Sequence, residues 1–260
     1  MSKQLLIYER ATPISIDKHR DVSVRSGANW HFAARLNSVP ILVAEMEAAS
    51  AEMPIVFAGE GDALTPVALL GLHGDENQFV TADGNWQGSY IPAFLRRYPF
   101  VFAETGTEGQ TLTLCIDDAF EGVNTDGRGE RLFDSDGERT QYLNKMLQFT
   151  SDYQAQHTLT RDFCKQLVAL DLLEPAVATV TLRSGRTLTV TGFQRVNRTR
   201  LRELEDTDAT RLFRSEMMAL IYFHIASLGH ITQLASRMQS DTLEPQAETA
   251  QTDVSAEETV

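Results

Sequence analysis

The chain has 260 residues, of which 42% are hydrophobic and 23% charged, and its formal net charge is -13. This length allows one large domain or two modest ones with a substantial core. A chain this acidic is a poor partner for a phosphate backbone, because nucleic-acid affinity comes largely from Lys and Arg that displace counterions, and we therefore exclude nucleic acid.

The N-terminus, MSKQLLIYERATP, has too short an apolar run for a secretory signal. A membrane-spanning helix needs roughly 18 to 20 apolar residues, and no run of the chain approaches that length. We therefore expect a cytoplasmic protein that does not insert into a membrane.

The first predicted elements come before residue 52. Residues 15–24 alternate between apolar and polar and predict one extended element that is interrupted by charge. Pro40 breaks or begins any helix in this region, and the good helix formers that follow it predict a helix over residues 40–51.

An internal echo follows. MPIVFA at residues 53–58 is similar to YPFVFA at residues 98–103, and each run is followed by a polar link with glycine and a second apolar run. Each is preceded by a helical stretch that begins with proline, at residues 40–51 and 92–97. The pattern of helix, strand, turn and strand thus occurs twice, which indicates either a duplicated unit or two unrelated hairpins of similar composition.

Residues 118–137 are rich in Gly and Asp and predict a loop that is anchored by Leu132 and Phe133. The acids of this loop lack the twelve-residue register of an EF-hand, so we do not expect a calcium site.

The C-terminal half is mostly helical. Apolar residues at spacings of three and four predict a long amphipathic helix over residues 140–173 that ends at Glu174-Pro175. A hairpin is predicted next, with strands at residues 178–182 and 187–192 and a turn at residues 183–186, and then a short helix capped by Asn197 or Thr199. The last helix, residues 209–238, is apolar in its middle and should cross the core.

Residues 239–260 contain six acids, no Lys or Arg and no aromatic residue, and they should form a disordered acidic tail. The fold prediction is therefore a single α+β domain over residues 1–238. Antiparallel hairpins and short helices of its N-terminal half should pack against long C-terminal helices.

The chain resembles the SapC family of bacterial proteins from about Ile14 to Met238. The blocks that carry this resemblance are VALLGL (67–72), ENQFV (76–80), DGNW (83–86), YIPAFLRRYPF (90–100), LCID (114–117), LF (132–133), GF (192–193) and HIASL (224–228). Met53 and Asn197 depart from the family pattern, which usually has an aromatic residue and an Asp at these positions.

The resemblance implies a role rather than a reaction, because members of the family are commonly encoded beside TonB-dependent receptors and flavin-dependent halogenase-like proteins. We expect a non-catalytic binding or accessory protein in the uptake or modification of a substrate imported through such receptors. The alternatives are an enzyme that acts on a small molecule or peptide beside a halogenase-like protein, and a helper in surface-layer assembly or export.

The candidate binding residues lie between positions 83 and 97. Trp86 and Tyr90 could form an aromatic wall for a protein, peptide or small-molecule partner, or could cap a core. Arg96 and Arg97 project about 100° apart on a helix, so one could reach an anionic ligand, or either could pair internally with Asp83 or Asp117.

His19 stands among charged residues and is a further candidate, as a base or as a structural residue. His224 and Ser227 are neighbours on one helix face, but a core histidine bonded to a carbonyl explains the pair better than a Ser-His nucleophile does. No His spacing fits a metal, so we expect neither a metal nor a cofactor, and Cys115 and Cys164 should be buried free thiols.

Overall fold

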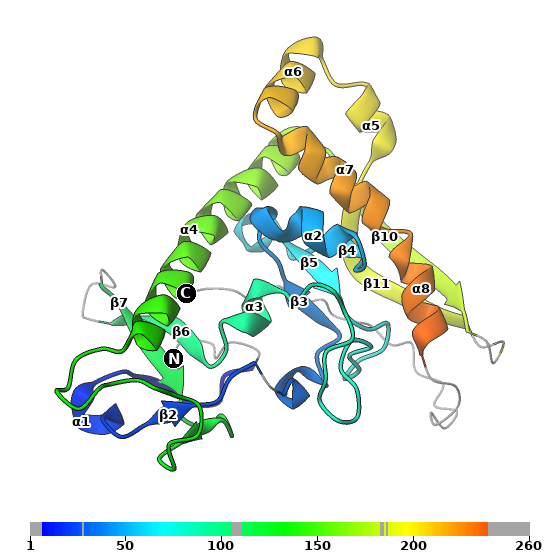
Figure 1. The fold of residues 1–260 in the computed structure, drawn as a ribbon. Coiled ribbons are helices and arrows are strands. Elements are labelled where there is room, and N and C mark those ends of the chain that lie inside the picture. The colour runs from blue at the N-terminus through cyan, green and yellow to red at the C-terminus, as the bar shows by residue number, and fades with distance from the viewer. Residues whose placement is uncertain (1–6, 28, 106–110, 183–184, 186, 239–260) are drawn as a thin grey trace.

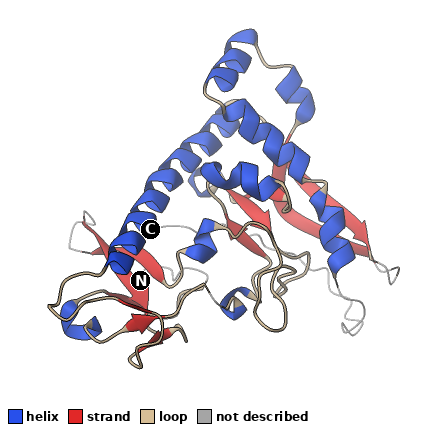
Figure 2. Ribbon diagram, viewed as in Figure 1, coloured by secondary structure: helices blue, strands red, loops and turns tan. Residues whose placement is uncertain are grey.

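The structure is a computed structural model that describes residues 7–27, 29–105, 111–182, 185 and 187–238. It contains antiparallel sheets and helices arranged around one long diagonal helix (Figures 1 and 2). The α+β prediction is confirmed. The predicted tail at residues 239–260 and part of the predicted turn at residues 183–186 lie outside the described residues.

The largest sheet has five strands in the spatial order β10-β11-β4-β5-β3. Every residue of β4 and β5 is buried, which accounts for their continuous apolar runs in place of alternation. The bounds of the strands are β3 Ser38–Pro40, β4 Ile55–Ala58, β5 Thr65–Leu69, β10 Leu173–Thr181 and β11 Thr187–Val196.

Two smaller sheets lie at the other end of the molecule, beside the N-terminal end of the long helix (Figure 1). Their strand orders are β1-β7-β6 and β8-β2-β9. The bounds are β1 Ala11–Pro13, β2 Ser23–Val24, β6 Phe100–Thr105, β7 Thr111–Asp117, β8 Val123–Asn124 and β9 Glu130–Arg131. The two hairpins of the internal echo, β4-β5 and β6-β7, therefore form as predicted but belong to different sheets.

Helix α4, Gln141–Ala169, links the two ends of the molecule (Figure 1). Its N-terminus is capped by Thr140, whose hydroxyl oxygen accepts the Leu143 N–H at 3.2 Å. The helix ends earlier than the predicted residue 173, because Asp171 takes the left-handed conformation (φ 51°) and redirects the chain into β10. Leu173 therefore contributes to the sheet and not to the helix face.

The remaining helices are short. The first hairpin is preceded by η2 and α2 instead of one helix from Pro40, because Pro40 is the last residue of β3. The predicted extended element at residues 15–24 is also wrong, since α1 forms a helical turn within it. The bounds are α1 Ile16–His19, η1 His31–Ala33, η2 Val43–Glu45, α2 Met46–Ser50, η3 Gly61–Ala63, α3 Ala93–Arg96 and α5 Arg198–Arg202.

The predicted last helix is broken into α6 (Asp206–Arg214), α7 (Met217–Ser227) and α8 (His230–Arg237). Glu216 takes the left-handed conformation (φ 63°) between the first two. Only Ile221, His224 and Ser227 of α7 are buried, so the expectation that this helix crosses the core is wrong.

Contrary to the expectation that no run approaches the length of a spanning helix, Met217–Arg237 is long and apolar enough to cross a membrane by length and composition. Its α7 part is bonded to the five-stranded sheet. His224 contacts the backbone of β4 and β11, and the Ser227 hydroxyl oxygen accepts the Ile55 N–H at 2.9 Å.

Hydrophobic side chains form two clusters. The larger one surrounds the five-stranded sheet, α2, α7 and the C-terminal half of α4. The smaller one lies between the two three-stranded sheets and the first turns of α4. Phe32 packs against both clusters and connects them.

Candidate functional site

The loop that holds the predicted aromatic wall is packed onto the core. The Trp86 ring is half-buried, stacks on Phe79 with ring centroids 5.4 Å apart, and meets Trp30 edge-on at 6.0 Å. Its indole N–H donates to the backbone oxygen of Tyr90 at 2.9 Å. The indole therefore uses its face and its hydrogen-bond donor within the protein.

Tyr90 is held by a buried carboxylate. Glu45, only 4% exposed, accepts hydrogen bonds from the Tyr90 hydroxyl at 2.7 Å and from the N–H groups of Leu42 and Ala93. Burial and the neighbouring Glu45 carboxylate raise the pKa of the Tyr90 phenol, so this group stays a neutral donor. The carboxylate thus fixes the first turn of α3 to the start of η2.

The two adjacent arginines have different environments. Arg96 is exposed, donates to the backbone oxygen of Ile91 at 2.9 Å, and lies over the ring of Phe149 on α4. Arg97 is only 4% exposed, and its guanidinium lies 4.2 Å from the centroid of Tyr153. The predicted divergence of the pair is confirmed, and Arg96 is the member that reaches solvent.

Asp117, a suggested internal partner of the arginines, is fully buried and serves the backbone. Its carboxylate accepts N–H groups of Glu9, Arg10 and Ala119 at 2.8 to 3.1 Å. Asp83 is exposed in the turn before Trp86, and its carboxylate accepts no hydrogen bond from the described residues.

His19 lies away from the other candidates, on α1. It is 3% exposed, and its Nε2 is 3.4 Å from a carboxylate oxygen of Asp118. Its Nδ1 lies 3.2 Å from the backbone of Ser15. The structure thus brings Trp86, Tyr90 and Arg96 together and places His19 at a separate position, where it joins α1 to the end of β7.

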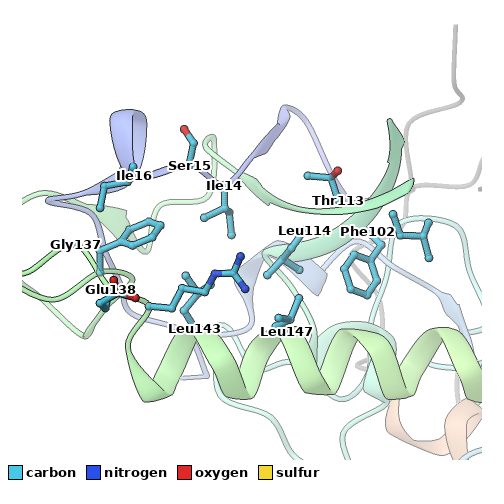
Figure 3. Close-up of a pocket in the computed structure, with 13 residues that line it drawn as sticks. Ile14, Ser15, Ile16, Phe102, Thr113, Leu114, Gly137, Glu138, Leu143 and Leu147 are labelled. Atoms are coloured by element: carbon cyan, nitrogen blue, oxygen red, sulfur yellow. The ribbon is translucent and has the colours of Figure 1, made fainter. Parts of the chain in front are cut away.

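A pocket of about 460 Å³ lies next to α1, and we call it the β6-β7 pocket. It falls within the roughly 300 to 1,000 Å³ that is typical of small-molecule sites. Figure 3 shows Ile14 and Leu114 on the strand side projecting toward Leu143 and Leu147 of α4. The complete lining is Ile14, Ser15, Ile16, Phe102, Leu112, Thr113, Leu114, Phe133, Gly137, Glu138, Arg139, Leu143 and Leu147.

Three segments far apart in the sequence build this pocket. The Ile14 N–H donates to Leu114 O at 3.0 Å and extends the pairing of β1 with β7. Gly137 (φ 86°) closes the opposite side, where a Cβ would come within 3.0 Å of the Ile16 side chain. Since only glycine adopts this conformation freely, the loop can approach α1 closely here.

The charged residues of the lining are few and belong to one segment. Glu138 and Arg139 are exposed lining residues of the loop before α4. Within the described part of the chain, no carboxylate lies within ion-pair distance of the Arg139 guanidinium. A cation in a pocket that is also lined by aliphatic side chains suits an amphipathic ligand with an anionic group.

The lining offers little for catalysis, since it contains no histidine, cysteine or aspartate. Cys115, the neighbour of Leu114 on β7, is 1% exposed, and burial raises the pKa of its thiol. Cys164 is likewise buried, and burial raises its pKa to about 12, so both thiols are protonated as expected of inert core cysteines. Among the described residues, no three His, Cys, Asp or Glu side chains gather as metal ligands.

Sequence reasoning did not find this pocket. It treated Phe133 as a loop anchor and Leu143 and Leu147 as the apolar face of a helix, which they are. The signal that was available is Arg139 just before a helix that carries Leu143 and Leu147 on one face of its first turns, but nothing local shows that β1 and β7 leave space above that face.

Comparisons with known proteins agree with the resemblance seen in the sequence. A family model described as SapC matches residues 14–234, most of the chain. No curated protein and no solved structure matches it.

Proposed function

The chain belongs to the SapC family, and we propose that it is a cytoplasmic, non-catalytic binding protein whose ligand is a small amphipathic carboxylate in the β6-β7 pocket. In this role it would be an accessory protein in the uptake or modification of a substrate imported through TonB-dependent receptors. The observation that carries the proposal is the pocket itself, whose lining combines several aliphatic side chains with Arg139.

The apolar lining supports the ligand's body. Ile14, Leu114, Leu143 and Leu147 face one another across the pocket (Figure 3). Burying apolar ligand surface against them contributes about 25 cal/mol per Å² before the cost of immobilising the ligand. The apolar body of the ligand is therefore an alkyl chain or an aromatic ring.

The charged edge supports a carboxylate. Arg139 offers a planar fork of N–H donors that matches two carboxylate oxygens, and Glu138 can accept a hydrogen bond from a ligand hydroxyl or amide. The absence of His, Cys and Asp from the lining favours binding over the alternative of an enzyme beside a halogenase-like protein.

The test is calorimetric titration of the full-length protein with decanoate, decylamine and decanol, which share one alkyl chain and differ in head group. We expect decanoate to bind most tightly. Arg139→Gln should weaken decanoate binding roughly tenfold to a hundredfold, because a hydrogen bond to a charged group contributes about 1.5 to 3 kcal/mol.

Lys145→Gln is the matched control, since it removes one positive charge from the same end of α4 without altering the pocket lining. Leu147→Trp should fill the pocket and abolish binding of all three probes while the protein stays folded. Equal binding of decanoate and decylamine, or an unchanged affinity in Arg139→Gln, would refute the proposal. Chemical conversion of a bound probe would favour the enzyme alternative.

A further inference from the structure

The outer face of α7 is apolar although it lies at the surface. From Met217 to Gly229 the chain has no Asp, Glu, Lys or Arg. Ala219, Tyr222 and Ala226 are exposed, Tyr222 by 53%, and Met218 and Ile225 beside them are half-buried. We call these five residues the α7 outer face.

The inner face of α7 is fixed, so the outer face cannot turn inward. His224 donates from Nδ1 to Ile55 O at 2.8 Å and accepts the Val196 N–H at 3.1 Å. A surface helix of a globular protein normally carries charged residues on its outer side, and an exposed apolar patch marks an interaction surface.

We propose that the α7 outer face is the interface between two copies of this chain, in which the two α7 helices pack antiparallel and cross at Tyr222. This inference is independent of the proposed ligand, because α7 lies beside the C-terminal end of α4, whereas strands β6 and β7 lie beside its N-terminal end (Figure 1).

The residues of the face are complementary to themselves under two-fold symmetry. With the axis at Tyr222, Met218 of one copy lies opposite Ala226 of the other, and Ala219 lies opposite Ile225. A large side chain thus meets a small one on each side, and the two Tyr222 rings meet at the centre. Such self-complementarity is what an isologous interface requires, and large-to-small packing lets two helices approach closely.

Charge near α7 also favours a second copy. Residues 195–216 contain six arginines and five acidic residues, a net charge of +1 in a chain of net charge -13. Two copies that meet beside this nearly neutral segment avoid the electrostatic repulsion that contact between the acidic parts of the two chains would cause. The acidic residues of the same segment disfavour an anionic lipid surface as the occupant.

The most specific test is cross-linking at the proposed axis. Cys115 and Cys164 are 1% and 2% exposed, so Tyr222→Cys introduces the one exposed thiol within the described part of the chain. We expect mild oxidation to convert Tyr222→Cys into a covalent dimer. Val168→Cys is the matched control, since Val168 is 51% exposed on α4 but outside the face, and it should remain uncross-linked.

Sedimentation velocity provides the second test. The wild-type chain should sediment as a dimer in the micromolar range, and Ala219→Glu should weaken dimerisation by at least about tenfold because it buries an unpaired charge. Ala219 is exposed, so this variant should fold. A monomeric wild-type chain, or equal cross-linking of Tyr222→Cys and Val168→Cys, would overturn the proposal. A monomer that binds neutral phosphatidylcholine vesicles through Tyr222 would overturn it in favour of a lipid surface.

Discussion

The imidazole of His224 on α7 donates a hydrogen bond to the backbone oxygen of Ile55 on β4, at 2.8 Å. The other ring nitrogen accepts the N–H of Val196 on β11, at 3.1 Å. Strands β4 and β11 share a single paired position, Gln194 with Phe57, and the ring satisfies backbone groups of both strands. One side chain therefore connects a surface helix to two strands of the central sheet.

Removing this ring should destabilise the fold. His224 is fully buried, and His224→Ala would leave the Ile55 oxygen and the Val196 N–H without their partner. Each unsatisfied buried group costs about 1 to 3 kcal/mol, so we expect a loss of about 3 kcal/mol in the free energy of unfolding, measured with urea. His73→Ala, at a half-buried loop histidine, should change stability little.

The same histidine predicts a pH dependence. Burial lowers the pKa of His224 from 6.5 to about 4. Between these values the unfolded chain takes up a proton that the folded chain does not, so the free energy of unfolding falls as pH drops from 6.5 to 4. The free energy of unfolding keeps its full value above pH 6.5, and at pH 4 it is lower by about 3 kcal/mol because of this one group.

Urea titrations at several pH values measure this effect. The stability of His224→Gln should depend less on pH over the window from 6.5 to 4 than that of the wild type. Parallel pH profiles for the two proteins would show that another group is responsible.

Trp86 should act through stability and not through ligand binding. Trp86→Ala removes its stacking on Phe79 and its hydrogen bond to Tyr90 O, and should cost about 3 kcal/mol of unfolding free energy. Decanoate affinity at a temperature where the variant is folded should not change. A variant with an intact thermal melt and weakened binding would instead place the ligand at this loop. Trp86→Phe, which keeps a ring, should be milder.

The two neighbouring arginines offer an internal comparison. Arg97 is buried beside Tyr153 and Phe94, whereas Arg96 is exposed. Arg97→Ala should therefore lower the melting temperature by several degrees, through lost packing and a lost cation-π contact, and Arg96→Ala should lower it less. Equal effects in thermal scanning would contradict this assignment.

Local patterns predicted much of the fold. The echoed apolar runs correctly gave β4, β5, β6 and β7, and periodicity gave α4. Asn197, one of the two predicted caps, caps α5 through hydrogen bonds from the N–H groups of Thr199 and Arg200.

The errors came from interactions distant in sequence. The composition of α7 indicated a core helix, but only Ile221, His224 and Ser227 of this helix are buried. Likewise, the buried position of Glu45 depends on three donors, two of which come from residues more than 40 positions away. The β6-β7 pocket has the same origin, because its walls meet only after β1 pairs with β7.

The central claim is that a carboxylate ligand occupies the β6-β7 pocket. Photolabelling with a decanoate analogue that carries a diazirine at its methyl end, followed by mass spectrometry of peptides, tests it directly. We predict adducts on the peptides that contain Leu114, Leu143 or Leu147. Excess decanoate added before irradiation, or the Leu147→Trp substitution, should prevent their formation. Adducts confined to α7 or to the Trp86 loop, or a labelling yield that decanoate does not lower, would contradict the claim.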